Sequence, residues 1–196
     1  DAICAGSAGS TSLKFGAYAM RAAGSMRLLC GGQSDDWQGG PHFASAEAKG
    51  VVLATHDWGH AMDHEAGLHF VVTWLEANIA GLKVAAAGHR VVLGGTRYHG
   101  PVLIEGDVLD YLDSLAEMEP SHQRFNVRGA RALATAFPSR RQVGCFDNWF
   151  HRTMPGISQP YAIPKAVRAP RVPHGGYPGR PNDAIRRRVP SCAPTA

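Results

Sequence analysis

The sequence of 196 residues predicts an α/β fold, a mixed sheet flanked by helices, followed by an irregular basic tail. Three observations lead to this prediction. Apolar runs of strand length alternate with stretches of helical periodicity, which is typical of α/β domains. Hydrophobic residues make up 44% and charged residues 18% of the chain, as in ordinary globular domains. The composition then changes abruptly near residue 165.

The first elements of the folded body form a predicted hairpin. An apolar run at Ala2–Ala5 and an alternating run at Leu13–Met20 flank a turn of small and hydroxyl residues at Gly6–Ser12. The following segment, Cys30–Gly50, is rich in Gly, Ser and Asp. We therefore expect a loop or a poorly defined β segment there.

The rest of the body alternates helices with strands. The strongest helix prediction covers Asp63–Ala80, because apolar residues recur on one face, Asp63 can cap the start and Gly81 follows the end. Five further elements are expected. They are the strands Val84–Val92, Pro101–Ile104 and Gln142–Phe146 and the helices Asp107–Met118 and Asn126–Phe137.

The excess of positive over negative charge lies entirely in the tail of the chain. Residues 166–196 contain six arginines and one aspartate, a net charge of +5, whereas the other residues hold 14 basic and 15 acidic side chains. The tail also carries six of the thirteen prolines and too little apolar surface to offset the entropy of ordering. We expect a folded domain at 1–165 and an irregular tail at 166–196. Because no aromatic residue interleaves with Arg186–Arg188, a solvated tail is favoured over a nucleic-acid partner.

Composition also disfavours other classes of protein. No stretch approaches 18 apolar residues, so we expect no membrane-spanning helix. No signal-peptide pattern follows Asp1, which favours a cytoplasmic location. The four cysteines are scattered without a CxxC pair. This spacing excludes a zinc ribbon and favours reduced thiols.

Two glycine-containing segments could bind an anion. In Gly6–Lys14, glycines expose backbone N–H groups, hydroxyls can donate to phosphate oxygens and a lysine ends the segment, although no Walker A motif is present. An ordinary surface turn is the alternative. In Gly88–Gly95, Arg90 lies within an apolar strand and needs a partner. That partner is either a structural carboxylate or an anionic ligand.

A third segment places a carboxylate where α/β proteins bind ligands. Asp147 directly follows the predicted strand Gln142–Phe146. The carboxyl end of a buried strand is the usual position of ligands and metals in such sheets. A helix cap is the alternative interpretation of Asp147.

Taken in order, these segments resemble the acetate kinase family, part of the actin-like ATPase superfamily. The resemblance implies a ribonuclease-H-like lobe over 1–165. The family motifs are N-A/C-G-S-S-S-x-K, G-H-R-V-V-H-G-G, A-P-L-H-N-P-x-N, V-F-D-T-A-F-H-x-T-M-P and Y-x-I/L-P. Their counterparts are Ser7–Lys14, Gly88–Gly95, Glu119–Asn126, Cys145–Pro155 and Tyr161–Pro164.

The resemblance implies Mg²⁺-dependent transfer of the γ-phosphoryl group of ATP to acetate. Acetate is ionised at neutral pH and needs no general base, so the site must supply positive charge and alignment. The resemblance makes Arg90 the ligand of the carboxylate or the moving phosphoryl group. Asp147 and Ser7 would position the metal. His122 would line the phosphate path, and Val92 would form the pocket for the methyl group.

The remaining family roles fall on the hairpin and on the tail. Ser10, Ser12 and Lys14 would contact the phosphates of ATP. His174 would stabilise charge in the transition state. Acetate, propionate and butyrate stay open as the acid, and a homodimer is the assembly that the resemblance implies.

The chain departs from the family motifs at several positions, and no segment matches the family's second lobe. A catalytically incomplete fragment without activity of its own is therefore the alternative function. The departures are Ser7 for Asn, Leu93 for His, Ser121 for an apolar residue, Gln123 for Asn and Asn148–Trp149 for Thr-Ala.

A minor alternative is a metal-binding protein. His56, His60 and His64 are spaced four residues apart and would share one face of a helix. Gly59 and a helix start near Asp63 argue against this interpretation.

Overall fold

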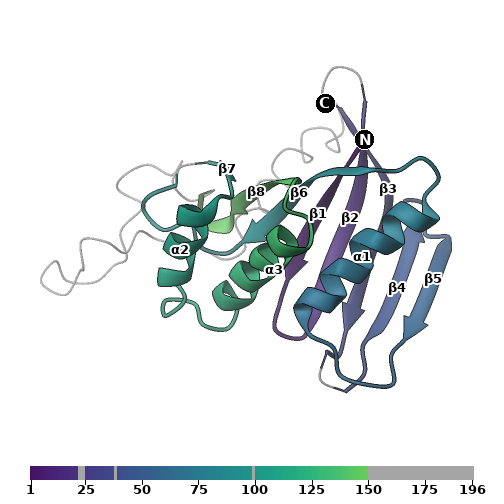
Figure 1. Cartoon of the computed structure of the whole chain (residues 1–196), viewed down its shortest axis with the longest axis horizontal. Helices are drawn as coiled ribbons and strands as arrows, with labels where there is room; N and C mark the ends of the chain where they lie inside the picture. The colour runs from purple at the N-terminus through teal and green to yellow at the C-terminus, as the bar shows by residue number, and fades with distance from the viewer. Residues whose placement is uncertain (22–24, 38, 99, 150–196) are drawn as a thin grey trace, which may run out of the picture.

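A computed structural model describes residues 1–21, 25–37, 39–98 and 100–149. Its centre is one eight-stranded sheet with the strand order β5-β4-β3-β2-β1-β6-β8-β7 (Figure 1). The strands are β1 (Ala2–Ala8), β2 (Ser12–Met20), β3 (Met26–Asp35), β4 (His42–Glu47), β5 (Val52–Asp57), β6 (Val84–Val91), β7 (Val102–Leu103) and β8 (Arg141–Phe146).

The sheet is mixed. Strands β1 to β5 form an antiparallel meander, whereas β6 is parallel to β1 and β8 is parallel to β6. The short strand β7 pairs antiparallel with β8 at one edge. The prediction of an α/β mixed sheet is confirmed, and this arrangement is that of a ribonuclease-H-like lobe.

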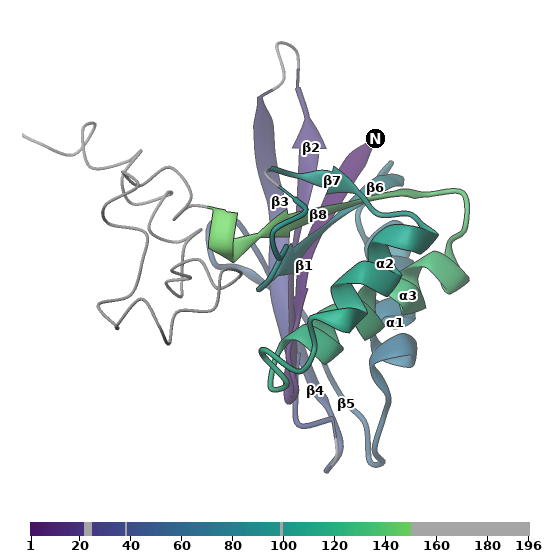
Figure 2. The same cartoon turned by 90° about the vertical axis from the view of Figure 1, so that its left-hand side faces the viewer.

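The described helices cover one face of the sheet (Figure 2). Helix α1 (His64–Asn78) leads from β5 to β6, and helices α2 (Gly106–Ser114) and α3 (Gln123–Ala136) lie between β7 and β8 in the chain. At the start of α1, Asp63 caps the helix by accepting from the backbone N–H of Ala66 at 2.8 Å. None of these helices is long and apolar enough to cross a membrane.

The core lies between the sheet and these helices. Strand alternation sends Leu13, Phe15 and Phe43 toward α1, where Leu75 is fully buried. A second cluster joins the ends of β6 and β8 to α2 and α3. Two of the four cysteines lie in the first cluster as free thiols, and burial raises the pKa of Cys4 to about 12. These thiols are packing groups rather than nucleophiles.

Of the two alternatives expected for Cys30–Gly50, the β segment is correct and the loop is wrong, because β3 and β4 occupy most of it. The glycines in β3 allow neighbouring strands to pack closely and do not form a turn. A side chain at Gly32 would collide with the Ala44 carbonyl and the Phe15 ring. The predicted hairpin is confirmed, but its turn is shorter than expected, since β1 runs to Ala8 and β2 begins at Ser12. Strand β5 is an element that the sequence pattern does not predict.

Candidate active site

A polar pocket opens where the hairpin, the end of β6 and the start of α3 meet. Its volume is about 620 Å³, part of which is open to solvent. The carboxyl ends of the parallel strands β1 and β6 lie at this pocket, the position that α/β sheets use for ligands. The lining residues are Ser7, Ala8, Gly9, Ser12, Lys14, Arg90, Val92, His122 and Asn126.

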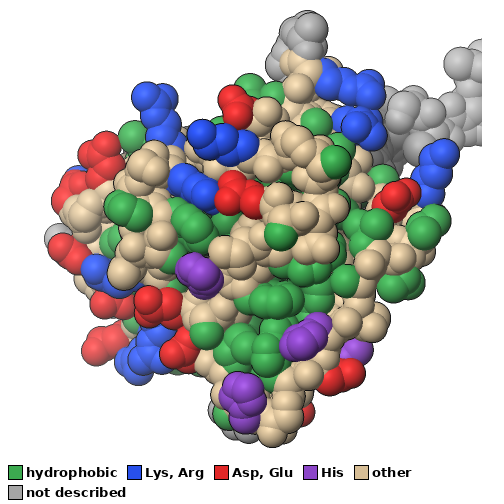
Figure 3. Space-filling model, turned by 45° about the vertical axis from the view of Figure 1, so that its right-hand side comes forward, with side chains coloured by type: hydrophobic (Ala, Val, Ile, Leu, Met, Phe, Trp, Pro, Cys, Tyr) green, Lys and Arg blue, Asp and Glu red, His purple; other side chains and the backbone are tan. Residues whose placement is uncertain are grey.

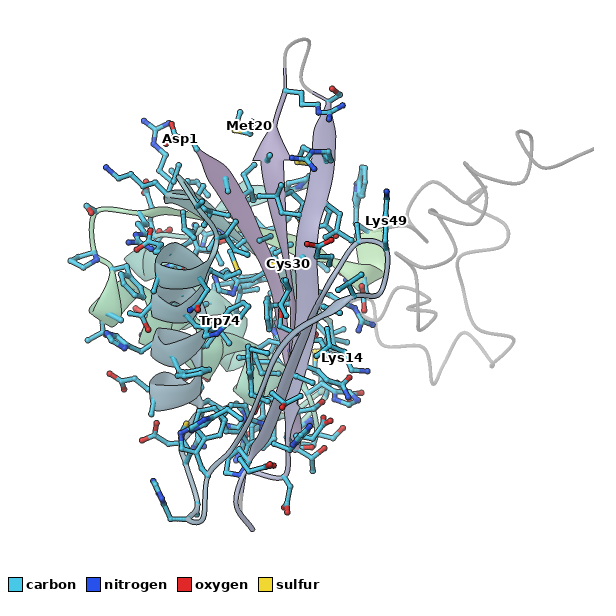
Figure 4. All side chains as sticks on the ribbon, turned by 90° about the vertical axis from the view of Figure 1, so that its right-hand side faces the viewer. Asp1, Lys14, Met20, Cys30, Lys49 and Trp74 are labelled. Atoms are coloured by element: carbon cyan, nitrogen blue, oxygen red, sulfur yellow. The ribbon has the colours of Figure 1, made fainter. Side chains whose placement is uncertain are left out.

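Strand alternation places Ser7, Lys14 and Arg90 on the face that the described helices leave uncovered. Leu13 and Val91 are buried toward the helices, so their neighbours Lys14 and Arg90 point the other way. Ser7 pairs with Lys14 across the hairpin. In Figure 4, Lys14 and the Trp74 of α1 lie on opposite sides of the sheet. The pocket therefore gathers two cationic side chains, Lys14 and Arg90, and two hydroxyls, those of Ser7 and Ser12.

Arg90 has a carboxylate partner in Asp147. The Arg90 Nε donates to both carboxylate oxygens at 3.2 and 3.0 Å, and its Nη2 donates to Oδ2 at 2.7 Å. The Asp147 side chain is 2% exposed and the Arg90 side chain 35%. Asp147 lies behind Arg90 and does not itself line the pocket. The predicted pair of site residues is thus brought together, with Arg90 facing the pocket.

His64 fixes the turn of the hairpin. Its Nε2 donates to the Gly9 carbonyl at 2.7 Å, and the Gly9 N–H donates to the Ser12 carbonyl at 2.8 Å. Asp36 N–H donates to the Thr11 carbonyl at 3.1 Å. These bonds set the position of Ser12 at the pocket edge. Ser10, a predicted phosphate ligand, does not line the pocket.

The alternative of a three-histidine metal site is wrong for these residues. His56 lies in β5, His64 lies in α1 and His60 lies between them, so they share no helix. No group of three or more His, Cys, Asp or Glu side chains among the described residues could hold a metal ion. The His56 ring packs edge-on against Trp58, and Figure 3 shows histidines beside exposed apolar side chains.

Asn126 is a site residue that sequence reasoning missed. Its Nδ2 donates to the Ala8 carbonyl at 2.7 Å, and its Oδ1 accepts from the Val92 N–H at 3.1 Å. It therefore joins the end of β1 to the segment after β6. Its position as the last residue of the Glu119–Asn126 motif was the only signal in the sequence.

His89, next to Arg90, contributes no charge near neutral pH. It points into the core and is 8% exposed, with its Nε2 at 2.6 Å from the Gln142 side chain. Burial lowers the pKa of His89 to about 4. The positive charge at this end of β6 therefore belongs to Arg90.

The last predicted site residue, His174, lies outside the described residues, as do the predicted tail at 166–196 and the end of the Cys145–Pro155 motif. The roles of these residues stay predictions.

The fold is an α/β lobe with a polar pocket at the ends of its parallel strands. A propionate kinase from Francisella tularensis has the same fold, with a TM-score of 0.81 and 24% sequence identity over 98% of this chain and 49% of that chain. The Acetokinase family model matches residues 3–187, and the chain belongs to that family.

Relatives in this family support the assignment. The chain is 32% identical over 198 residues to an acetate kinase from Rhizobium meliloti, which covers 100% of this chain and 50% of that protein. It is 29% identical over 194 residues to an acetate kinase from Rhodopseudomonas palustris, covering 98% of this chain and 49% of that protein. The chain thus spans about half the length of these relatives.

Proposed function

We propose that this pocket is the carboxylate and phosphate site of an acetate kinase-like phosphotransferase. The reaction converts ATP and acetate, or another short-chain acid, to ADP and an acyl phosphate. The observation that carries the proposal is the position of Arg90, which faces a hydroxyl-lined pocket while Asp147 holds it from behind. Membership of the Acetokinase family supports the same conclusion.

The proposed mechanism relies on alignment and charge. A carboxylate and a triphosphate repel one another, so cationic groups must bring the attacking oxygen in line with the γ-phosphorus. The planar guanidinium of Arg90 is suited to two parallel hydrogen bonds with a carboxylate or phosphoryl group. Val92 would supply the apolar wall for the methyl group of the acid. His122 would donate to the phosphoryl group in transit.

The hairpin would bind the phosphates of ATP. Lys14 offers an ammonium group, and Ser7 and Ser12 offer hydroxyls on the same side of the pocket. The His64 contact to Gly9 keeps this turn in place before the nucleotide arrives. Ser10 would contact phosphate only if the turn moves toward the pocket.

The donor groups near the pocket suit Mg²⁺. This ion prefers oxygen ligands and usually takes one or two carboxylates together with phosphate oxygens and water. Asp147 provides one carboxylate and Ser7 a hydroxyl. Because Arg90 engages both Asp147 oxygens, a metal at Asp147 would use the remaining lone pairs of the carboxylate or take the place of Arg90. When bound, Mg²⁺ would neutralise charge on the phosphates.

Further features of the proposal rest on the family alone. His174 would stabilise the transition state, the protein would be a homodimer, and it would act in the cytoplasm. Sedimentation of the purified protein tests the homodimer directly, since a monomeric mass contradicts it.

The proposed activity is tested by trapping the acyl phosphate. The purified chain is incubated with acetate, ATP, Mg²⁺ and hydroxylamine, and hydroxamate is measured. We expect formation that is lost in Asp147→Ala and kept in Asp113→Ala, an exposed acid that does not line the pocket. A folded chain that forms no hydroxamate contradicts the activity and supports the alternative, a fragment that is inactive by itself.

A further inference from the structure

The backbone that follows β6 forms one wall of the pocket. Strand β6 ends at Val91, and the last strand pair joins Val91 to Phe146. The next three N–H groups, those of Val92, Leu93 and Gly94, have left the sheet ladder. Donors in such a half-buried position need other acceptors, because an unpaired buried N–H is costly.

Three side-chain amides accept these three N–H groups in succession. Asn126 Oδ1 accepts from Val92, Gln123 Oε1 accepts from Leu93, and Asn148 Oδ1 accepts from Gly94, each at 3.1 Å. Two of these amides come from the first turn of α3 and the third follows β8. We call Gln123, Asn126 and Asn148 the amide clamp.

The other ends of the clamp residues are also bonded. Gln123 Nε2 donates to the Leu93 carbonyl and to the Leu112 carbonyl of α2, both at 3.0 Å. The backbone N–H of Asn148 donates to the Val92 carbonyl at 3.3 Å. Gln123 is fully buried and Asn126 is 5% exposed. The clamp therefore fixes the segment from two sides within the folded body.

Positions of the clamp coincide with departures from the family motifs. Gln123, Asn148 and Leu93 each replace a different residue of those motifs. The Gln123 side chain accepts from the Leu93 N–H and donates to the Leu93 carbonyl. Three departures that are distant in sequence thus meet at one short segment.

We propose that Gln123 and Asn148 are positioning residues that set the place of the Val92 wall relative to Arg90. The inference rests on the proposed function, because it assumes that a carboxylate binds against Val92. Neither residue lines the pocket, so each acts through the backbone that it holds. Only two bonds separate the Val92 Cα from its methyl carbons, so a shift of that backbone moves the wall by a similar amount.

Two measurements on the full chain test the positioning role, with sodium acetate as the probe. Amide hydrogen exchange at Val92, Leu93 and Gly94 reports the clamp without any ligand. A titration followed by NMR of the Val92 methyl groups gives the acetate Kd. The variants are Gln123→Met and Asn148→Leu, which remove the acceptors, and Asn148→Ser, which retains a side-chain oxygen. Asn78→Leu, at an exposed amide in α1, is the matched control.

We expect faster exchange at Leu93 in Gln123→Met and at Gly94 in Asn148→Leu. The acetate Kd should rise by about three- to fivefold in both, the scale of losing the burial of one methyl-sized group. Asn148→Ser should recover part of the affinity, and Asn78→Leu should match the wild type. A merely structural role would lower stability and leave the Kd of the folded protein unchanged.

The outcomes separate this inference from the proposed function. If the wild type binds acetate and the clamp variants that fold bind it equally well, the positioning role is overturned and the proposed function survives. If the wild type binds no acetate, the positioning role and the proposed function are both overturned. Slow hydrogen exchange at these amides would then show that the amide clamp stabilises the fold and nothing more. Should Gln123→Met fail to fold, the pair Asn148→Leu and Asn148→Ser decides the question.

Discussion

Asp147 has a carboxylate that is almost fully buried, and both of its oxygens accept from Arg90. Breaking such a pair lowers the free energy of unfolding, because the remaining buried charge has no partner. The Arg90 side chain meanwhile stays 35% exposed and lines the pocket. The pair can therefore stabilise the fold and still present a cation to an anionic ligand.

Removal of Arg90 should destabilise the protein through Asp147. We expect Arg90→Met to lower the free energy of unfolding by about 3 kcal/mol, the lower end for a broken buried pair. The double variant Arg90→Met/Asp147→Leu should recover most of this loss, as measured by urea unfolding. The exposed pair of Arg131 and Asp110 is the control, where Arg131→Met should cost at most about 1 kcal/mol. Equal losses in the single and double variants would contradict the interpretation.

His89 should make the fold sensitive to acid. Its pKa is about 4 in the folded protein against 6.5 for a solvent-exposed histidine, because burial disfavours the charged ring. Between these pH values the unfolded chain binds a proton that the folded chain does not, so stability falls as the pH falls, by up to about 3 kcal/mol. Urea unfolding from pH 7 to 4 should show a smaller fall in His89→Gln. A fall in His89→Gln as large as in the wild type and the exposed control His60→Gln would disprove this.

Sequence reasoning identified the charged residues of the site but not the contacts between them. Arg90 and Asp147 stand out because each interrupts or ends an apolar strand. Their pairing depends on the parallel register of β6 and β8, which no local pattern encodes. Asn126 and Gln123 were missed as ligands of backbone groups, since a buried amide in a helix looks like any polar helical residue.

At the scale of elements, the packing of α1 on the sheet requires glycine at position 67. The Trp37 ring lies so close to Gly67 that a side chain at Gly67 would collide with it. Trp37 is 4% exposed and stacks on His64, which in turn holds the hairpin turn at Gly9. The packing of α1 on the sheet and the position of the pocket edge are therefore connected through this contact.

Alanine at Gly67 should destabilise the protein, although alanine ordinarily favours a helix. We expect Gly67→Ala to cost about 1–3 kcal/mol from overpacking against Trp37. At Gly106, the first residue of α2, no atom lies within 4 Å of an added Cβ, so Gly106→Ala should be neutral or stabilising by up to about 1 kcal/mol. Thermal unfolding compares the two. Similar effects of both substitutions would contradict the predicted clash.

Helices were easier to predict than strands for a physical reason. The apolar face of α1 repeats every three or four residues and its cap is local, so the expected Asp63–Ala80 matches closely. In β3, glycine is required by neighbours from β2 and β4 that are remote in sequence. The glycine-rich segment therefore left a loop and a poorly defined β segment as alternatives, where the tertiary structure needs a closely packed strand.

At the scale of the whole molecule, the sheet separates two tasks. One face packs on α1, α2 and α3 and supplies the hydrophobic core. The other face carries Ser7, Lys14 and Arg90, which alternate with buried neighbours along their strands. The order of motifs predicted this lobe from sequence. In the structure the hairpin motif and the motifs around Arg90 and Asp147 meet at the same end of the neighbouring strands β1, β6 and β8.

The most direct test of the proposed site is an NMR titration of the full chain with ATP and with acetate. We predict that amides of Ser7, Gly9, Ser12 and Val92 shift on addition of either ligand, and that Arg90→Ala abolishes the shifts caused by acetate. The groove between α2 and α3 is a competing site, because Arg124, Arg128 and Arg131 line it together with Asp113 and Glu117. Shifts confined to that groove, with the hairpin and Val92 unmoved, would contradict the site proposed for this lobe.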